Sequence, residues 1–305
     1  MPKFSVQICC YNSEKYLSQT IESVAAQTFR DWELVIVNDG SADATERIVK
    51  EYIEKGLPIV YHYQNNRGFA SARNKAVELS KGEWIAILDH DDIWLPDKLE
   101  IQSRSVDRFP EAKLHFANSE WFTDDGKIVR KTVRDGKMKG GLLVEPFYRL
   151  LIEGCFIDSE TVAVERASLL ERKGFNEKYA YIVDYDLFIK MAEKYPVYYE
   201  DRVLAKWRMH PGQATAKMEE AVSREYVELF EAALKDRGFP SKIEDRIKRI
   251  MVYHTLNHSL SQLGRAGAGE FLKGIRRGIR TRPLSPRTYL KVLQTFCRAS
   301  RARLE

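Results

Sequence analysis

The first hundred residues alternate short apolar runs with longer segments of helical periodicity, and this alternation limits the available folds. Between the runs, apolar residues recur at helical spacing, as in Leu17, Ile21 and Val24. Strands separated by helices of about 10–15 residues predict right-handed βαβ units and a mostly parallel sheet covered by helices on both faces. The predicted strands are Phe4–Cys10, Trp32–Asn38, Ile59–Tyr63 and Trp84–Leu88.

Capping residues predict where the intervening helices begin and end. We expect a helix from about Glu14 with Ser13 as its cap. A second helix opens at Asp43 and closes at Gly56, and Pro96 starts a later one. The helix between the third and fourth strands has an apolar face formed by Phe69, Ala72, Ala76 and Leu79.

The pattern loosens after residue 112. Asp125-Gly126 predicts a hairpin turn between the strands His115–Trp121 and Lys127–Val133, and residues 134–160 look irregular. We place a boundary near residue 215, because everything after Gln213 reads as helix. The remaining predicted strands are Thr161–Val164, Val197–Tyr199 and Val203–Met209, and the remaining predicted helices are 183–194, 217–237, 241–263, 268–281 and 287–300.

Composition excludes several classes of protein. Hydrophobic residues make up 44% and charged residues 30% of the 305 residues, which is an ordinary globular composition. No run approaches the ~20 apolar residues of a transmembrane helix, and the start lacks a secretory leader, so we expect a cytoplasmic protein. So few cysteines in a long chain expected in the cytoplasm predict reduced thiols, and the absence of a CxxC pair gives no support for a structural zinc site. The four cysteines are Cys9, Cys10, Cys155 and Cys297.

The strongest chemical signal is an acidic cluster that follows the fourth predicted strand. Asp89, Asp91 and Asp92 are separated only by His90. Carboxylates packed so closely repel each other unless a cation or protons intervene, and their hard oxygens suit Mg²⁺ or Mn²⁺. Ligands of open α/β sheets bind at the carboxyl ends of strands, which favours a metal site here. The alternative is a solvated acidic turn before the helix at Pro96.

Other candidates follow the first two strands and the third predicted helix. Asp39 can accept a hydrogen bond from a base or a ribose, or it can make a turn with Gly40. Tyr11 can stack on a nucleobase, or it can be a core aromatic residue. Arg73 can bind a diphosphate bidentately, or it can form an ordinary ion pair.

Two further candidates lie in the second hundred residues. Asp184 stands at a predicted helix start with Asp186 two residues later, so one carboxylate can serve as a base while the other interacts with the helix dipole. Arg208 and His210 end a strand on the same face, where they can grip a phosphate or a metal. The alternative for His210 is a purely structural role.

Taken together, these stretches resemble glycosyltransferase family 2 and its GT-A fold. They occur in the family's order and cover about residues 4–212. The matching stretches are Ser5–Asn12, Thr20–Phe29, Trp32–Ser41, Asn66–Asn74, Gly82–Pro96, Lys173–Asp186 and Trp207–His210.

The resemblance implies a role for each matching residue. Tyr11 and Asp39 would hold the nucleobase, with uracil the usual one, and Arg73 would support the nucleotide end. Asp89 would lie by the ribose, and Asp91 would ligate a divalent metal on the diphosphate. Asp92 would shape the loop or help with the donor sugar. Asp184 would be the general base, and Arg208 and His210 would approach the diphosphate or support the metal.

The implied reaction moves a sugar from a nucleoside-diphosphate sugar, with UDP as the expected nucleotide, to a hydroxyl with inversion at the anomeric carbon. Mn²⁺ or Mg²⁺ would assist it, and a glycan or lipid-linked acceptor would receive the sugar, as in polysaccharide biosynthesis. Residues 1–215 would form the catalytic domain, with the nucleotide-sugar part at about 1–110 and the acceptor part at about 111–215. Two positions depart from the family pattern, with Asn38 and Val183 where acids are usual.

Three other functions compete with this interpretation. A nucleotidyltransferase would need a glycine-rich basic loop after the first strand, and Cys10–Lys15 has none. A phosphate-loop nucleotidase needs a GxxxxGK[ST] motif, which is absent. The third is a non-catalytic nucleotide-sugar or nucleic-acid binding module with a basic tail. The acidic body and the lack of nucleic-acid motifs argue against nucleic acid as a partner.

Residues 216–305 are expected to form a basic helical extension. Residues 246–305 carry fourteen Lys or Arg and two Glu, a net +12 that leaves −7 for the rest of the chain. In the stretch 268–281, Ile275 and Ile279 belong to an apolar arc that is opposed by Lys273, Arg276, Arg277 and Arg280. This pattern predicts contact with an anionic membrane surface. Alternatively, the apolar arc packs on the first part of the chain or on another subunit.

Overall fold

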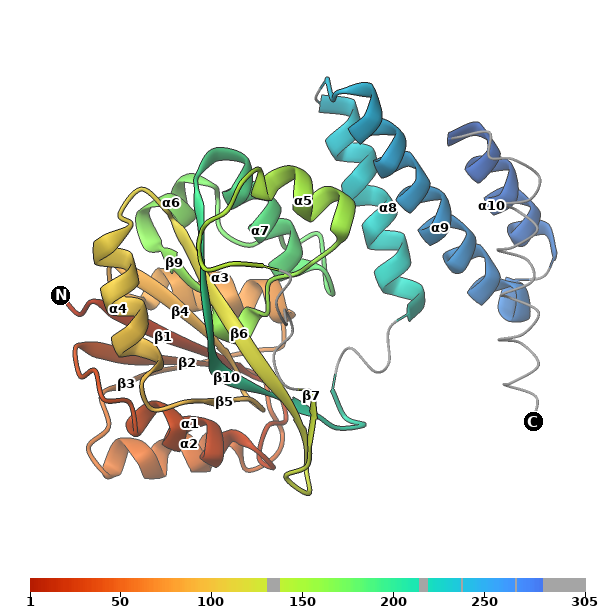
Figure 1. Ribbon diagram of the computed structural model, residues 1–305. Coiled ribbons are helices and arrows are strands. Elements are labelled where there is room, and N and C mark those ends of the chain that lie inside the picture. Colours follow the sequence, from red (N-terminus) through yellow and green to blue (C-terminus); the bar gives the residue numbers. More distant parts are fainter. Residues whose placement is uncertain (131–137, 214–218, 237, 267, 282–305) are drawn as a thin grey trace. The chain divides into compact units, whose positions relative to one another are not determined.

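A ten-stranded sheet runs through the first of the two units into which the chain divides, and helices make up the described part of the second (Figure 1). The first unit is Met1–Pro211 and the second is Gly212–Glu305. The structure is a computed structural model, and it describes residues 1–130, 138–213, 219–236, 238–266 and 268–281.

The four strands predicted in the first hundred residues form the parallel part of the sheet, in the order β3-β2-β1-β4. The chain first builds outward from β1 to β2 and β3, and then returns to the other side of β1 to add β4. Strand order therefore reverses between β1 and β4, which is where open α/β sheets bind ligands. These strands are β1 (Phe4–Cys10), β2 (Trp32–Asp39), β3 (Ile59–Gln64) and β4 (Trp84–Asp89).

Alternate side chains of these strands enter two cores, one on each face of the sheet. Phe4, Val6 and Ile8 are fully buried among side chains from α1 (Leu17–Ala25), α2 (Thr45–Glu54) and α4 (Lys98–Arg108). Cys9 points the other way, against Ala72 and Ala76 of α3 (Phe69–Leu79). Since the side chains of a strand alternate in direction, a continuously apolar strand must be covered on both sides.

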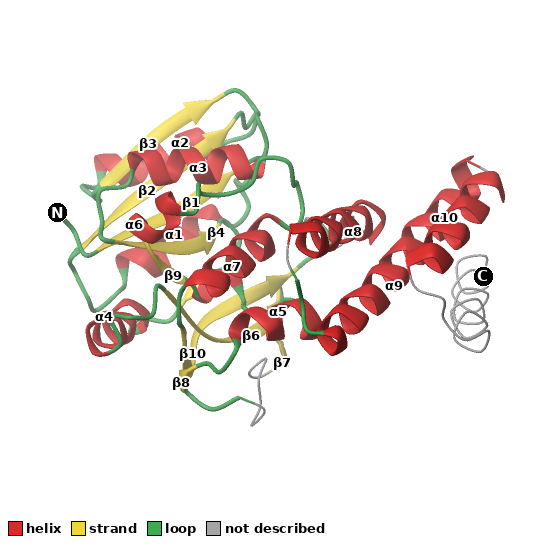
Figure 2. Ribbon diagram, turned by 90° about the horizontal axis from the view of Figure 1, so that it is seen from above, coloured by secondary structure: helices red, strands yellow, loops and turns green. Residues whose placement is uncertain are grey.

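The rest of the sheet mixes strand directions. A short strand, β9, pairs antiparallel with both β4 and β6, while β6 and β10 run parallel to each other. Helix α7 (Val183–Lys194) packs on α5 (Pro146–Glu153) and on β6 (Figure 2). The remaining strands are β5 (Ile93–Trp94), β6 (Leu114–Thr123), β7 (Ile128–Arg130), β8 (Gly141–Leu142), β9 (Ala163–Glu165) and β10 (Val197–Met209).

Two expected helix starts are wrong. Helix α1 begins at Leu17 rather than near Glu14, and the Ser13 hydroxyl accepts a hydrogen bond from the backbone N–H of Tyr11 instead of capping the helix. Residues 14–16 form a turn before the helix, in which the Ser13 carbonyl accepts hydrogen bonds from the N–H groups of Tyr16 and Leu17. Helix α4 begins at Lys98, two residues beyond Pro96.

The stretch 134–160 is more ordered than expected, and one predicted break in a strand is absent. Helix α5 lies within that stretch, and a 3₁₀ turn follows at Ser159–Thr161. The two strands expected at 197–209 are one strand, β10, with an irregular register between Glu200 and Ala205. A further helix, α6 (Arg166–Glu171), was not predicted. The turn at Asp125-Gly126 is present, with Gly126 at φ 80°.

The described part of the second unit contains α8 (Glu219–Asp236), α9 (Ser241–Ala266) and α10 (Ala268–Thr281) (Figure 1). Helix α9 packs against both α8 and α10. The helix expected at 287–300, the apolar stripe within it and Cys297 lie outside the described residues. Of the described cysteines, Cys9 and Cys10 are buried and carry free thiols.

Candidate active site

The carboxyl ends of β1, β2 and β4 meet at one edge of the sheet. In the parallel registers Cys10 lies opposite Asn38 and Cys9 lies opposite Asp89. Tyr11, Asp39 and Asp91 therefore lie at or just beyond the same edge. Sequence reasoning predicted this convergence, and the reversal of strand order between β1 and β4 falls at the same place.

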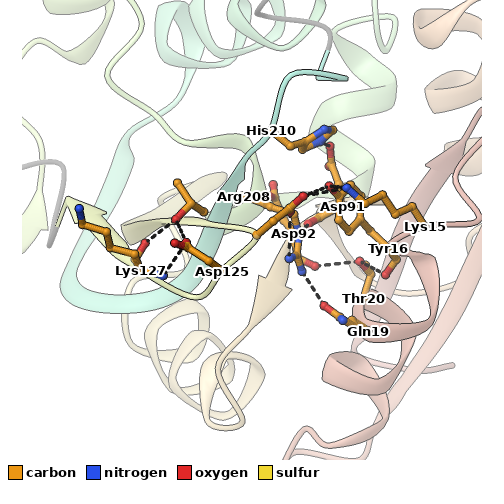
Figure 3. Close-up of polar contacts among 12 residues, drawn as sticks. Lys15, Tyr16, Gln19, Thr20, Asp91, Asp92, Asp125, Lys127, Arg208 and His210 are labelled. Carbon is orange, nitrogen blue, oxygen red and sulfur yellow. Dashed lines mark hydrogen bonds and ion pairs between the residues drawn. The ribbon is translucent and has the colours of Figure 1, made fainter.

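The acidic loop after β4 reaches the end of β10. The imidazole Nε2 of His210 lies 2.9 Å from Asp91 Oδ2, and the His210 ring packs against Tyr16 with the ring centroids 4.7 Å apart (Figure 3). The side chain of Asp91 is 15% exposed, and that of His210 is 10% exposed. The structure thus places a carboxylate and an imidazole side by side at a partly open point.

Arg208 holds this loop in place instead of facing open space. Its guanidinium lies 4.5 Å from the ring centroids of both Tyr16 and Phe122. Its Nε donates to the carbonyl of Asp91 over 2.8 Å, and its Nη2 donates to Gln19 over 2.7 Å (Figure 3). The side chain is only 5% exposed, so its main observed role is to fix the backbone that carries Asp91.

Asp92 also stabilises the loop. Its Oδ1 accepts a hydrogen bond from the backbone N–H of Arg208 over 2.8 Å, and its carbonyl accepts one from Thr20 Oγ1. Burial, followed by the charge of Glu160, holds the pKa of Asp92 well above its usual value. Of the two roles expected for Asp92, these contacts favour shaping the loop.

Asp39 organises the loop before α3. Its Oδ1 accepts hydrogen bonds from Gln64 Nε2 and from the backbone N–H of Arg67, and its Oδ2 accepts one from the N–H of Gly68. A carboxylate has about four acceptor positions, so a nucleobase N–H would share this group with the protein. Tyr11, by contrast, is 52% exposed at the end of β1 and offers an open ring face.

Arg73 is fully buried and joins two of the candidate acids. Its Nη2 donates to Asp89 Oδ1 over 2.6 Å and lies 4.0 Å from Asp184 Oδ2. Burial raises the pKa of Asp89 to about 6, although the charge of Arg73 opposes this shift. Neither Nε nor Nη1 of Arg73 has a hydrogen-bond partner among the described residues. This residue is therefore placed to act through Asp89 and Asp184.

Asp184 lies in the first turn of α7, where the positive end of the helix dipole favours a carboxylate. Its Oδ2 accepts a hydrogen bond from the hydroxyl of Ser159 over 2.8 Å. Its Oδ1 is buried and has no hydrogen-bond partner among the described residues. The Asp184 side chain is 18% exposed, so its carboxylate remains accessible and can serve as a base toward a hydroxyl.

Sequence reasoning missed several residues of this site. Ser159, Tyr16 and Gln19 contact Asp184, His210 and Arg208, respectively. None of the three carries a local pattern that marks it. Gln19 and Tyr16 lie in or next to α1 with ordinary helical spacing, and Ser159 falls in the stretch that looked irregular.

An open groove of about 630 Å³ lies beside the site along the β6–β7 hairpin. Asp124, on its wall, accepts hydrogen bonds from the Tyr16 hydroxyl and from Lys15, so the groove borders the residues around His210. Its apolar wall exposes Ile128 and Val129. The lining residues are Thr123, Asp124, Asp125, Lys127, Ile128, Val129, Met209 and Pro211.

The carboxylate of Asp91 and the imidazole of His210 are both groups that can ligate a divalent cation. Among the described residues, no three His, Cys, Asp or Glu side chains converge as a complete metal site. Mg²⁺ and Mn²⁺ commonly take only one or two protein ligands and complete their shell with water and substrate phosphates. A carboxylate and an imidazole at a partly open edge suit that mode of binding.

Comparison with known proteins identifies the family. A profile of glycosyl transferase family 2 matches residues 5–143. An uncharacterized glycosyltransferase of Methanocaldococcus jannaschii is 32% identical over 212 residues, which cover 68% of this chain and 71% of that protein. One from Rickettsia typhi is 32% identical over 218 residues, which cover 70% of this chain and 66% of that protein. The match spans only 36% of a Rickettsia felis relative.

Solved structures show the same fold. The chain matches S. aureus TarS 1–349 in complex with UDP-GlcNAc with a TM-score of 0.70 at 20% identity, covering 92% of this chain and 81% of that one. It matches the mannosyltransferase PcManGT from Pyrobaculum calidifontis, in complex with GDP-Man and Mn²⁺, with a TM-score of 0.62 at 18% identity, covering 99% and 87%.

The fold and the acid-lined edge define a GT-A type protein. The chain belongs to glycosyl transferase family 2, a family of glycosyltransferases. Within the described part of the chain, no helix combines the length and the apolar character needed to cross a bilayer.

Proposed function

We propose that this protein transfers a sugar from a nucleoside-diphosphate sugar to an acceptor hydroxyl with inversion. The main supporting observation is that Arg73 contacts both Asp89 and Asp184. Its Nη2 lies 2.6 Å from Asp89 Oδ1 and 4.0 Å from Asp184 Oδ2, at the sheet edge that also holds Asp91. This arrangement places a base candidate close to the acids expected to bind the donor. The relatives share the family and the fold with this chain, so the identity of the substrate is part of our proposal.

Asp91 and His210 would hold Mg²⁺ or Mn²⁺. When bound, the cation would neutralise negative charge on the diphosphate leaving group. Arg208 would orient the site by holding the Asp91 carbonyl, and Asp92 would hold the end of β10. PcManGT, a protein of the same fold, was solved with Mn²⁺, which supports this proposal.

Asp184 would accept the proton of the attacking hydroxyl. A base positioned in this way contributes typically about 10²–10⁴-fold to the rate. Direct attack on the face opposite the leaving group inverts the anomeric configuration. The proton moves from the acceptor oxygen to the Asp184 carboxylate, and the bond from the anomeric carbon to the diphosphate breaks as the new glycosidic bond forms.

The donor nucleotide would be UDP. Tyr11 offers an exposed ring for stacking, and Asp39 lies beside it at the end of β2. TarS was solved with UDP-GlcNAc and PcManGT with GDP-Man, so both nucleotides occur on this fold. The parts around residues 1–110 and 111–215 would serve the donor and the acceptor, and the groove beside Asp124 would take a glycan or lipid-linked acceptor.

The helices of the second unit would contact an anionic membrane surface. On α10, Gly274 and Gly278 are buried, and a Cβ at Gly274 would strike Ser259 Oγ of α9. The glycines therefore form the packing face, while Ile279 is 47% exposed and is flanked by the exposed residues Arg276 and Arg280. Each Lys or Arg near an anionic membrane contributes ~1 kcal/mol.

A donor panel tests the transferase proposal. The release of free nucleoside diphosphate from UDP- and GDP-sugars, with water as the acceptor, is measured with Mn²⁺ and again with a chelator. Binding of a donor without release under any condition would favour a binding module instead.

Sedimentation with anionic vesicles at low salt tests the membrane proposal, and a protein that stays in the supernatant contradicts it.

A further inference from the structure

The 3₁₀ turn at Ser159–Thr161 is anchored by residues from three different elements. The indole N–H of Trp94 donates to the carbonyl of Glu160 over 2.7 Å, and Gln102 Nε2 donates to the carbonyl of Thr161 over 2.7 Å. The backbone N–H of Ile87, on β4, donates to the carbonyl of Val162 over 3.1 Å. These three donors belong to buried residues, so the backbone at Ser159 is held rigidly.

The side chain of Ser159 uses this rigid position to bind Asp184. Its hydroxyl donates to Asp184 Oδ2 over 2.8 Å, and it joins two segments that lie 25 residues apart in the chain. Arg73 Nη2 lies 4.0 Å from the same oxygen. Oδ2 is thus the oxygen that the protein occupies, and Oδ1 is left without a hydrogen-bond partner among the described residues.

A carboxylate needs such a contact to hold one orientation. The torsion about the bond that carries an aspartate carboxylate is broad, because it joins an sp³ carbon to an sp² carbon. Arg73 at 4.0 Å attracts the charge of Asp184 but makes no hydrogen bond that would fix the rotation of the group. Among the described residues, the hydroxyl of Ser159 donates the hydrogen bond that fixes the rotation of the Asp184 carboxylate.

We propose that Ser159 is a positioning residue for the general base, holding the Asp184 carboxylate in one orientation through its hydrogen bond to Oδ2. The inference rests on the proposed transferase function and adds a residue to it. Ser159 acts through Asp184 and takes no proton itself. Misorientation of a catalytic group by a fraction of an ångström is enough to reduce a rate substantially.

The test compares Ser159→Ala, Ser159→Thr and the control Ser80→Ala. Ser80 is also buried and donates a side-chain hydrogen bond, but to the carbonyl of Ala76. The readout is kcat and KM for nucleoside diphosphate release with the donor that binds best in the panel. We expect Ser159→Ala to lower kcat by about ten- to a hundredfold, the value of a hydrogen bond to a charged group, with the donor KM unchanged.

Two further readouts separate positioning from a general loss of structure. Ser159→Thr keeps the hydroxyl and should recover most of kcat. In an Asp184→Asn background, Ser159→Ala should cost nothing more, because both changes remove the same function.

The outcomes distinguish this inference from the proposed function. A wild-type protein that releases no nucleotide from any donor overturns the transferase proposal and this inference with it. An active wild type in which Ser159→Ala keeps its kcat, or still loses rate when Asp184 is already Asn, overturns the inference alone. If Ser159→Ala does not fold, Ser159→Cys keeps the size of the side chain with a weak donor and should show the same loss of kcat.

Discussion

His210 Nε2 lies 2.9 Å from Asp91 Oδ2, although 119 residues separate them in the chain. The pairing of β5 with β10 explains this meeting. Trp94 lies opposite Ala205 and Ile93 lies opposite Lys206 in an antiparallel register. Continuing that register brings the loop before β5 alongside the end of β10. The pair proposed to hold the metal is therefore formed only when the last strand of the first unit joins the sheet.

The first prediction concerns this pair. Asp91→Asn and His210→Ala should each weaken Mn²⁺-dependent binding of the donor nucleotide by tenfold or more, because each removes a proposed ligand or its partner. Calorimetry with UDP in the presence of Mn²⁺ measures the effect. Asp107→Asn, at an exposed surface ion pair with Lys3, is the matched control and should bind as the wild type does. Unchanged Mn²⁺-dependent affinity in both variants would contradict the proposed site.

The second prediction concerns the base. Asp184→Asn keeps the shape of the side chain and can still accept a hydrogen bond from Ser159. It should lower kcat by about 10²–10⁴-fold and leave donor affinity nearly unchanged, because only proton transfer is lost. Steady-state kinetics and donor titration measure the two quantities separately. A collapse of donor affinity with kcat preserved would make Asp184 a binding residue.

The third prediction concerns the buried ion pair of Arg73 with Asp89. Arg73→Met should destabilise the first unit by at most about 3–5 kcal/mol, since it removes the buried partner of Asp89, a carboxylate that is 30% exposed. Adding Asp89→Asn should restore part of that stability. Urea denaturation measures the free energy of unfolding. Arg47→Met, which breaks an exposed pair with Glu51, is the control and should change it by less than ~0.5 kcal/mol.

The fourth prediction concerns acid stability through His115. Burial lowers the pKa of His115 from 6.5 to about 4. The unfolded chain therefore binds more protons than the folded one between these values, so stability should fall as the pH drops from about 6.5 to about 4, by at most ~3 kcal/mol. Urea denaturation at pH 7 and pH 5 measures the loss. His115→Gln should reduce the difference between the two pH values, and an unchanged difference would exclude His115 as its source.

The fifth prediction concerns the nucleotide. Calorimetry should rank UDP above GDP and ADP, because Tyr11 is proposed to stack on the uracil ring and Asp39 to hydrogen-bond it. Asp39→Ala should blur this ranking, and it should also loosen the loop that Asp39 holds through Arg67 and Gly68. Tyr11→Ala should weaken all three nucleotides by similar amounts, because every base has a face for stacking. Tighter binding of GDP by the wild type would overturn the assignment.

The parallel strands and their helices were predictable because their signals are local. The apolar run Phe4–Cys10 is a strand over its full predicted length, and α7 spans the predicted 183–194. The start of α1 was predicted about three residues too early, because residues 14–16 form a turn before the helix. Helix α5 and the turn at Ser159 were missed because short segments carry too few residues to show a period.

The sequence by itself determined the sheet of the first unit and the candidate acids at its edge, because apolar periodicity and residues at strand ends act over a few neighbours. It did not determine which of these acids are free to react. Tertiary structure decided that Arg208 and Asp92 stabilise the loop after β4, which carries Asp91. It also decided that Arg73 is buried beside Asp89 and that Ser159 hydrogen-bonds Asp184. Those roles depend on burial and on hydrogen bonds between distant segments, which exist only after the strands have paired.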